Sequence, residues 1–514
     1  MKPNQVKEFD ARGRRALEKL VGELPAGDTE FRAALTGSVI GKLPLTTGEQ
    51  VPEIFARARE VQSMWAQTPF SERRTKMLAF HDLLLDHRHE LLDLLQWETA
   101  KARASAFEEV ADVAINARYY ARNADKLLST RKVGGAVPVL TKARVYYKPK
   151  GVVGVITPWN YPLTLVASDA LAALMAGNAV VLKPDSQTPF TAFAVQSLFE
   201  KAGFPPGLFQ IVVGAGSVLG TPMIEHADYV MFTGSTATGR TIAEQAGRNL
   251  VGFSAEMGGK NALIVRRDAH VGKAAVGALR ASFSNSGQLC ISIERIYVHT
   301  DIWDEFVPAF VRKVKSMRVG PAMDFSTDMG PLINQSQLDK VKAHVDDAVA
   351  KGATVLAGGQ ELPDAGQFGY APTVLTGVTA EMDVFAEETF GPVVSLYRVA
   401  DDAEAIELAN ATDYGLNASV WTGSLAAGEA VAAQLETGMV NVNEGYAAGW
   451  GSIGAPNGGV KDSGMAHRHG PEGIRKYCDM QTIATQRLVP IKFPAPVMTA
   501  FLKVLRRVPP QIIK

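Results

Sequence analysis

Apolar residues recur at helical spacing near the start of the chain. From residue 52 to about residue 124 they lie three or four positions apart among charged side chains, which predicts a set of scaffold helices. The apolar positions of this pattern include Ile54, Ala58, Val61, Trp65, Leu78, Phe80, Leu83 and Leu84.

Short apolar runs then alternate with helical stretches between residue 151 and about residue 265. Runs at 152–156, 179–182 and 209–213 are short enough to be buried strands, and the stretches between them are long enough to be helices. This alternation predicts a parallel sheet with helices on its faces. Dinucleotides bind at the carboxyl ends of the strands in such sheets, so we expect a nucleotide-binding domain here.

A second alternating region runs from about residue 261 to residue 443. It contains a helical stretch at 271–285, and its strand-like runs lie at 295–299, 393–398 and 418–422. We expect this region to form a second parallel-sheet domain that meets the first one at a cleft.

Two further segments stand outside this pattern. Residues 132–148 are turn-rich and short-stranded, which predicts a protruding β-hairpin, and an exposed strand edge leads us to expect a homo-oligomer. The C-terminal tail is basic and amphipathic, and we expect it to dock on protein in preference to an anionic membrane surface. The tail carries Val497, Met498, Phe501, Leu502, Leu505 and Val508 on its apolar face, with Lys503, Arg506 and Arg507 elsewhere.

Composition narrows the classes of protein that fit. A chain of 514 residues that is 46% hydrophobic is long enough for two or three domains with large cores. Its 53 basic and 53 acidic residues balance, which argues against a nucleic-acid partner, because a phosphate-binding surface needs a basic excess. Two cysteines, no apolar N-terminal signal and no run of about 18 apolar residues predict a cytoplasmic protein.

The chemistry that this sequence can support centres on Cys290. It follows a polar, glycine-containing turn and precedes an apolar β-branched run. The other cysteine is Cys478, so the pair offers neither a metal cluster nor a disulfide framework, and we expect no metal. A free cysteine is often a small buried hydrophobe. As a nucleophile it must react as the thiolate, which needs a nearby base or a local positive field.

Glu256 is the candidate base. It lies just before the glycine pair Gly258 and Gly259 and ahead of an apolar run, and taken alone it would be a solvated loop acid. The segments at 256–260 and 287–290 together resemble the signature pair of the aldehyde dehydrogenase superfamily, E-x-G-G-K and G-Q-x-C.

The resemblance extends from about residue 35 to residue 486. Five further elements stand in the family's order, P-W-N-[FY]-P at 158–162, K-P-x-x-x-T-P at 183–189, F-T-G-S-T-x-x-G at 232–239, E-E-x-F-G-P at 387–392 and P-x-G-G-x-K-x-S-G at 456–464. The resemblance implies an α/β fold with two Rossmann-like parallel-sheet domains and a β-arm through which subunits form a homodimer or homotetramer.

The family's domain division carries over to this chain by position. It implies a nucleotide-binding domain of residues 1–131, 149–258 and 445–469 and a catalytic domain of residues 259–444. The oligomerisation arm would comprise residues 132–148 and 470–490, and the amphipathic tail residues 491–514.

The resemblance also implies the chemistry. Attack of Cys290 on an aldehyde would give a thiohemiacetal, whose oxyanion would be held by the Asn160 side chain and the Cys290 backbone N–H. Hydride transfer to a nicotinamide would leave a thioester, and Glu256 would activate the water that hydrolyses it. Without the motif around it, Asn160 would be read as a turn residue.

The cofactor residues follow from the same motifs. Gly234, Ser235 and Gly239 would bind the pyrophosphate at a helix N-terminus. The other expected cofactor residues are Thr157, Trp159, Lys183 and Ser186, with Glu388 and Phe390 at the nicotinamide ribose and ring.

The choice between the two nicotinamide cofactors depends on Ser186. Family members that prefer NAD commonly carry a glutamate at this position. A serine removes the repulsion that a carboxylate would exert on a 2′-phosphate, and Lys183 can pair with that phosphate. We therefore expect NADP in preference to NAD.

The substrate remains the open part of the sequence analysis. The chain looks most like a bacterial branch usually labelled succinate-semialdehyde dehydrogenase, whose substrate carries a carboxylate and requires a cation. The arginine that follows the P-W-N-F-P motif in better-known members is replaced by Ser168, so the candidate cations are Arg295 and Arg468. Arg468 itself falls where many relatives carry a second glutamate.

Two alternatives stay open beside this one. The nearest is a dehydrogenase of apolar medium- or long-chain aldehydes that is peripherally membrane-associated through the tail. The remote alternative is a non-catalytic nucleotide-binding protein, against which the presence of Cys290, Glu256 and Asn160 argues.

Overall fold

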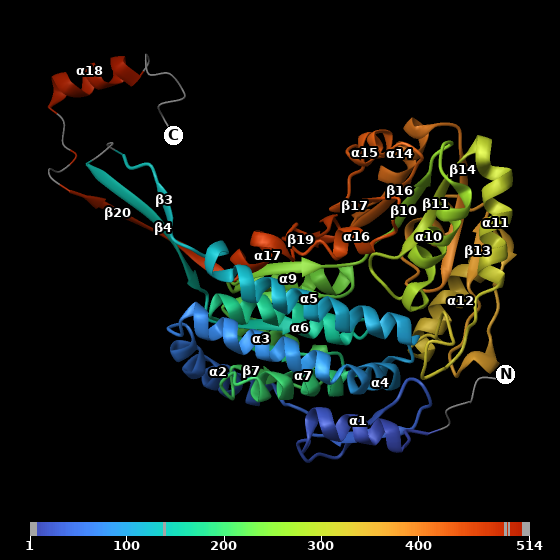
Figure 1. Cartoon of the computed structure of the whole chain (residues 1–514), viewed down its shortest axis with the longest axis horizontal. Helices are drawn as coiled ribbons and strands as arrows, with labels where there is room; N and C mark the ends of the chain where they lie inside the picture. The colour runs from blue at the N-terminus through green and yellow to red at the C-terminus, as the bar shows by residue number, and fades with distance from the viewer. Residues whose placement is uncertain (1–7, 137–139, 488–490, 492–493, 506–514) are drawn as a thin grey trace.

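The computed structural model of the chain describes residues 8–136, 140–487, 491 and 494–505. Two large sheets lie in different halves of the molecule, and a β-arm extends away from them (Figure 1). Within the described residues no helix is long and apolar enough to cross a membrane.

The six-stranded sheet is built mainly from the first alternating region, in the order β19-β9-β8-β5-β6-β7. Its parallel strands are β5 (Val152–Ile156), β6 (Ala179–Lys183), β7 (Phe209–Ile211), β8 (Tyr229–Thr233) and β9 (Gly252–Glu256), and its antiparallel edge strand is β19 (Gly464–Met465). Its helices are α6 (Pro162–Ala176), α7 (Pro189–Lys201), α8 (Gly216–His226) and α9 (Thr236–Arg248). The predicted parallel sheet is confirmed.

Helices from the start of the chain pack on this sheet through α2 and otherwise on its helices α6 and α7. They are α2 (Val51–Trp65), α3 (Phe70–Asp86), α4 (Arg88–Thr99) and α5 (Arg103–Leu127), preceded by α1 (Ala11–Val21) and the hairpin of β1 (Thr29–Arg32) and β2 (Val39–Leu43). Ala58 and Trp65 are fully buried, as the helical pattern predicts, whereas Ile54 and Val61 are only partly buried. Helix α5 packs against α6, and α3 against α5 and α7 (Figure 1).

The seven-stranded sheet comes from the second alternating region, in the order β12-β13-β14-β11-β10-β16-β17. Its strands are β10 (Asn261–Val265), β11 (Ile293–His299), β12 (Thr354–Ala357), β13 (Thr373–Thr376), β14 (Val393–Val399), β16 (Asn417–Trp421) and β17 (Met439–Val442), of which β12 alone runs antiparallel to its neighbour. Helices α10 (Val271–Phe283), α11 (Trp303–Lys315), α12 (Gln335–Ala350), α14 (Asp402–Asn410) and α15 (Leu425–Ala432) cover it. The strands predicted at 295–299, 393–398 and 418–422 are confirmed.

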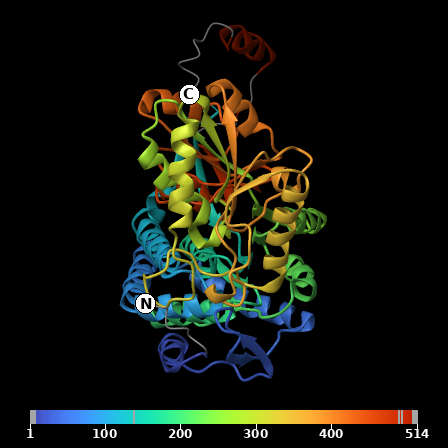
Figure 2. The same cartoon turned by 90° about the vertical axis from the view of Figure 1, so that its right-hand side faces the viewer.

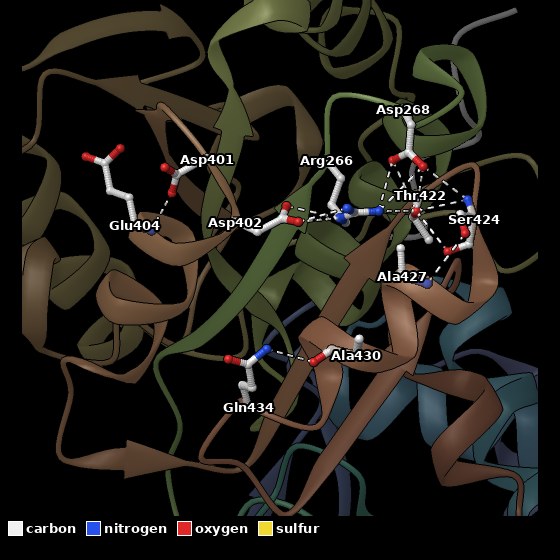
Figure 3. A network of polar contacts seen from close by, with 10 residues as sticks. All are labelled: Arg266, Asp268, Asp401, Asp402, Glu404, Thr422, Ser424, Ala427, Ala430 and Gln434. Atoms are coloured by element: carbon white, nitrogen blue, oxygen red, sulfur yellow. Dashed lines mark hydrogen bonds and ion pairs between the residues drawn. The ribbon is translucent and has the colours of Figure 1, made fainter.

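A polar network closes the carboxyl end of this second sheet (Figure 3). Arg266 follows β10 directly, and its guanidinium pairs with Asp402 at 2.8 Å and with Asp268 at 3.2 Å and donates to Thr422 Oγ1 at 2.8 Å. These bonds tie the ends of β10 and β16 to the N-terminus of α14. Cys290 lies at the other end of the same sheet, just before β11, so this network is structural.

The arm is a three-stranded antiparallel sheet in the order β20-β4-β3. The strands are β3 (Arg131–Val133), β4 (Thr141–Pro149) and β20 (Cys478–Gln486), and β20 pairs with β4 along its whole length. The predicted hairpin is therefore confirmed, while its pairing with another subunit and the exact domain boundaries stay predictions.

Helix α18 (Ala495–Leu505) lies beyond the tip of the arm, away from both large sheets (Figures 1 and 2). Val497, Met498 and Leu502 are exposed on it, with 45%, 49% and 67% of their surface accessible. The predicted basic residues Arg506 and Arg507 and the apolar Val508 lie outside the described residues. Docking of this helix on protein stays a prediction, and the body of its own chain does not receive it here.

Candidate active site

Cys290 is presented by a turn with left-handed backbone. Asn285, Ser286 and Gly287 have φ values of +51°, +59° and +70°. A Cβ atom on Gly287 would lie 2.0 Å from the Gly391 carbonyl oxygen, so only glycine fits there. The Asn285 side chain stabilises the turn by donating to the carbonyl oxygens of Gln288 (3.0 Å) and of Asn160 (3.1 Å). The turn thus fixes Cys290 relative to the predicted oxyanion donor.

Asn160 lies beside Cys290 in the wall of one cavity. Its Nδ2 donates to the Gln288 carbonyl oxygen at 3.1 Å, and because an amide NH2 carries two hydrogens, a second N–H can serve an oxyanion. The Asn160 backbone carbonyl accepts from Lys101 Nζ at 2.7 Å. The Asn160 backbone and the Nδ2 end of its side chain are therefore both held by hydrogen bonds.

A buried ion pair stabilises the turn that carries Asn160. Lys101 and Glu109 are almost fully buried and contact each other directly. Glu109 Oε2 accepts from the backbone N–H groups of Leu163 (2.8 Å) and Thr164 (3.1 Å), which belong to the first turn of α6. Sequence reasoning missed both residues, because an isolated lysine and glutamate in a charged helical stretch carry no signal of burial.

Glu256 ends strand β9 and is only 7% exposed. Burial raises its pKa to about 7, and the positive charges of Arg468 and Lys476 limit the rise. Half of such carboxyls are ionised at neutral pH, which suits a general base.

Arg468 and Asp169 form a buried pair beside this base. Arg468 Nη2 lies 2.9 Å from Asp169 Oδ2 and also donates to Thr233 Oγ1, and Lys476 Nζ lies 3.5 Å from Asp169 Oδ1. Burial alone would raise the pKa of Asp169, but the two cations lower it below its usual value. With Glu256 ionised, two buried cations face two buried carboxylates, so the cluster is neutral overall.

The Cys290 thiol is neutral at ordinary pH in this environment. The residue as a whole is partly exposed, but the surrounding protein desolvates the sulfur, and with the negative charge of Glu388 this raises the thiol pKa to about 12. A thiol of this kind gives almost no resting thiolate, so its proton has to leave during attack.

The predicted pyrophosphate site lies at the start of α9. Ser235 caps this helix by accepting from the Thr238 backbone N–H at 3.3 Å. A Cβ atom on Gly239 would lie 2.3 Å from Met257 Sδ, so this glycine allows α9 to approach β9 closely. The Gly234 N–H donates to the Glu256 carbonyl oxygen at 3.1 Å, which links this turn to the base.

Lys183 and Ser186 line two different hollows in the surface of the first domain. Lys183 lies in a hollow of about 460 Å³, together with Gly216 and Thr238, and its Nζ donates to the Pro184 carbonyl oxygen at 3.1 Å. Ser186 is exposed and lines a separate hollow of about 580 Å³. The structure therefore brings Lys183 together with the first turn of α9, whereas Ser186 lies in the other hollow.

The second sheet contributes Glu388 and Phe390. Glu388 Oε1 accepts from the Gly259 N–H at 2.9 Å, and burial raises the pKa of this carboxyl to about 7. The Phe390 and Trp159 rings meet edge to face, with centroids 5.6 Å apart, across the two domains. Thr157 lies nearby with a buried Oγ1 that has no hydrogen-bond partner among the described residues.

A cavity of about 240 Å³ leads to Cys290. Most of its wall is apolar, and polar groups are few. Its lining includes Phe107, Ile115, Tyr161, Leu165, Leu289, Tyr446 and Trp450, together with Glu108, Asp112, Arg280 and Arg468.

One of the predicted substrate residues lies away from this cavity. Arg295 is 3% exposed and does not line this cavity. Its guanidinium donates to the carbonyl oxygens of Lys260 (2.8 Å), Leu408 (3.0 Å) and Ala409 (3.1 Å), so its donors are used inside the second sheet domain. Arg468 does line the cavity, but Asp169 already neutralises it.

Comparison with known proteins agrees with this arrangement. The model of the aldehyde dehydrogenase family matches residues 26–483. "Putative succinate-semialdehyde dehydrogenase [NADP(+)] 2" of Mycobacterium ulcerans is 55% identical over 94% of this chain and 90% of its own length. "Putative succinate-semialdehyde dehydrogenase [NADP(+)]" of Mycolicibacterium smegmatis is 52% identical over 98% of this chain and 96% of its own.

Solved structures show the same fold. Betaine aldehyde dehydrogenase from Staphylococcus aureus in complex with NAD+ is 31% identical, with a TM-score of 0.87 over 94% of this chain and 100% of its own. An NADP-dependent enzyme of E. coli is 32% identical, with a TM-score of 0.86 over 91% of this chain and 97% of its own.

Proposed function

The chain belongs to the aldehyde dehydrogenase family, and on that basis we propose that it oxidises succinate semialdehyde to succinate with NADP as hydride acceptor and Cys290 as nucleophile. The names of the relatives from Mycobacterium ulcerans and Mycolicibacterium smegmatis support this substrate. One observation carries the proposal. Cys290, Asn160 and Arg468 line the same cavity.

Attack on the aldehyde requires a thiolate, and the resting Cys290 thiol is neutral. Glu256, with a pKa of about 7, would take the proton as the sulfur bonds to the carbonyl carbon. The new oxyanion would accept hydrogen bonds from Asn160 Nδ2 and from the Cys290 backbone N–H. One such donor typically lowers the barrier by about 3–4 kcal/mol.

Completion of the reaction needs a second proton transfer. When bound, the nicotinamide supplies the hydride acceptor. Glu256 would release its first proton and then take another from the water that hydrolyses the Cys290 thioester. Arg468 and Lys476 favour the return of Glu256 to its anion, because their charges lower its pKa.

The residues present fit a dinucleotide. Gly234, Ser235 and Gly239 would hold the pyrophosphate at the N-terminus of α9. Thr157 Oγ1 is a buried hydroxyl without a partner among the described residues, which suits a ligand contact. Glu388 would accept from the nicotinamide ribose, and Trp159 and Phe390 would flank the ring.

The preference for NADP rests on Lys183 and Ser186. A buried lysine with no carboxylate within ion-pairing distance among the described residues can pair with a 2′-phosphate, and Ser186 adds no negative charge. We propose that kcat/KM is higher with NADP than with NAD, and a tenfold or greater advantage of NAD would refute this. Introducing the missing carboxylate, Ser186→Glu, should reverse the preference.

A second substrate class has its own support. The apolar lining of the cavity, with Phe107 54% and Ile115 48% exposed, fits the chain of an apolar aldehyde. Both classes would use the same Cys290 chemistry. They differ in whether the cavity has to recognise a carboxylate.

We also propose that the enzyme is a cytoplasmic homodimer or homotetramer assembled through the arm. Side chains of β20 are exposed along most of the strand, including Met480 at 70% and Ile483 at 46%. Exposed apolar edge strands call for a partner.

Steady-state NADPH formation by purified protein tests the proposal. Succinate semialdehyde, hexanal and a long-chain aldehyde are compared beside Cys290→Ala. The proposal requires the highest kcat/KM for succinate semialdehyde and loss of activity in the variant. Higher kcat/KM for the apolar aldehydes would move the assignment to the second class, and an active variant would reject Cys290 as nucleophile.

A further inference from the structure

The proposed substrate needs a cation for its distal carboxylate, and the two predicted arginines do not supply one. Arg295 lies outside the cavity, and Arg468 is buried against Asp169. Among the described residues that line the cavity, the remaining cation is Arg280, in the last turn of α10. Its side chain is 52% exposed, so it lies at the open side of the cavity.

Arg280 belongs to a group of donors that meet at one carboxylate. Its Nη2 lies 3.1 Å from Glu108 Oε1. The Tyr446 hydroxyl lies 3.0 Å and 3.1 Å from the two Glu108 oxygens, and the Tyr161 hydroxyl lies 3.4 Å from Oε2. All four side chains line the cavity that Cys290 lines.

This geometry is that of an anion site filled by the protein's own side chain. A guanidinium and two phenol hydroxyls are hydrogen-bond donors suited to a carboxylate. Tyr446 also packs beneath the Arg280 guanidinium, 5.5 Å from ring centroid to Cζ, which keeps the cation in place. Glu108 is 25% exposed, so its carboxylate has a route to solvent.

We propose that Arg280, Tyr446 and Tyr161 form the subsite for the distal carboxylate of the substrate, and that Glu108 occupies this subsite until the substrate displaces it. The inference rests on the proposed function, because it assigns the carboxylate of a semialdehyde to these donors. A neutral aldehyde would leave the Glu108 pair undisturbed and would use the apolar wall alone.

The exchange is energetically accessible. Displacement of Glu108 costs little, because the substrate carboxylate takes over the same three donors, and about fivefold in affinity is the scale expected for one partly exposed ion pair. Glu444 adds a second, weaker negative neighbour, 3.8 Å from Arg280 Nη1, and Asp112 is a further acid of the cavity wall. Removing the Glu108 charge should therefore favour an anionic substrate without harming a neutral one.

The test compares succinate semialdehyde with hexanal in three variants. Glu108→Gln should lower the KM for succinate semialdehyde about fivefold, because a competing carboxylate is gone and the donors remain. Arg280→Gln should raise that KM about tenfold or more, and Tyr446→Phe should raise it about threefold. The kcat/KM for hexanal should change by less than about twofold in all three, which separates recognition from a folding defect.

Arg318→Gln is the matched control. Arg318 is an exposed arginine paired with Asp328 at 2.8 Å, as Arg280 is paired with Glu108, but it does not line the cavity. Its removal should leave both substrates unaffected. If KM for succinate semialdehyde also rises in this control, the rise in Arg280→Gln reflects a general loss of positive surface charge.

Calorimetric titration with succinate provides a readout without turnover. Succinate should bind more tightly to Glu108→Gln and more weakly to Arg280→Gln than to the unchanged protein. If the protein oxidises hexanal but not succinate semialdehyde, the proposed substrate is wrong. The succinate affinities of the variants still test whether Arg280, Tyr446 and Tyr161 bind a carboxylate. If succinate semialdehyde is oxidised but neither its KM nor the succinate affinity responds to these variants, the subsite is wrong and the proposed function stands.

Discussion

The two sides of Cys290 are stabilised in different ways. On one side, Asn160 is held by hydrogen bonds from Asn285 and from the buried Lys101, which pairs with Glu109. On the other side, Glu256 has neighbours that act through charge, Arg468 and Lys476, while burial raises its pKa to about 7.

The difference shows how the site separates two requirements of the chemistry. An oxyanion donor has to be in a fixed position before the reaction, since preorganised donors give the largest electrostatic benefit. A general base in this mechanism has to accept and release a proton twice in each turnover, so its pKa must lie near the working pH. Variants on the two sides should therefore fail in different ways.

Loss of the base should have the largest effect. Glu256→Gln keeps the shape of the side chain but removes proton acceptance, so kcat should fall about 10²- to 10⁴-fold. In the unchanged enzyme, kcat/KM should rise as the pH increases through about 7, because Glu256 must be ionised. The pH profile of the variant should lose this rise. If the Glu256→Gln variant keeps the rise of kcat/KM with pH, Glu256 is not the general base.

Loss of the oxyanion donor should come next. Asn160→Ala should lower kcat about 10²- to 10³-fold with little change in the pH at which activity rises, because the donor has no titrating role. The measurement is kcat as a function of pH. A shifted profile in this variant would show that the two sides are not independent.

Removal of the ion pair that stabilises the Asn160 turn should have a smaller effect on kcat. Lys101→Met leaves Glu109 buried without its cation, and we expect about a tenfold loss of kcat as the turn shifts, together with a lower Tm. Thermal unfolding and kcat are measured together. The double change with Glu109→Gln should recover part of the Tm, because the uncompensated charge is removed, and no recovery would argue against the pair.

The smallest effect is expected from the charge beside the base. Arg468→Gln removes a cation that lowers the pKa of Glu256, so the rise of kcat/KM should move to higher pH by about one unit. At pH 9 the two enzymes should be nearly equal. Arg468→Lys keeps the charge and should restore the original profile, whereas an unshifted profile in Arg468→Gln would contradict the electrostatic role.

The sequence alone predicted the parts of this molecule that depend on local patterns. The strands at 295–299 and 393–398 were visible as apolar runs between helical stretches, and Cys290, Glu256 and Asn160 stood inside motifs. Lys101–Glu109 and Arg280–Glu108 were not predictable, because charged residues in helical patterns are usually solvated. Arg280 and Glu108 are 172 residues apart in the chain, and Lys101 and Glu109 are buried against the start of α6, so both pairs depend on tertiary packing.

Arg295 shows why position along the chain is a poor guide to a substrate contact. It follows the nucleophile turn in sequence, but in β11 its side chain points into the second domain, where backbone carbonyls accept its hydrogen bonds. A position close to Cys290 in the sequence does not determine on which face of β11 a side chain lies. Arg280 precedes the turn by a stretch of helix and was passed over, although it reaches the cavity.

The state of the resting thiol is the most direct test of the account. Alkylation of the free enzyme by iodoacetamide is followed between pH 6 and pH 10 by mass spectrometry of the Cys290 peptide, with the buried Cys478 as internal reference. A neutral resting thiol should react slowly at neutral pH, and its rate should still increase at pH 10, because burial raises the thiol pKa to about 12. A rate that reaches its plateau near pH 7 would show a preformed thiolate and contradict proton transfer to Glu256 during attack.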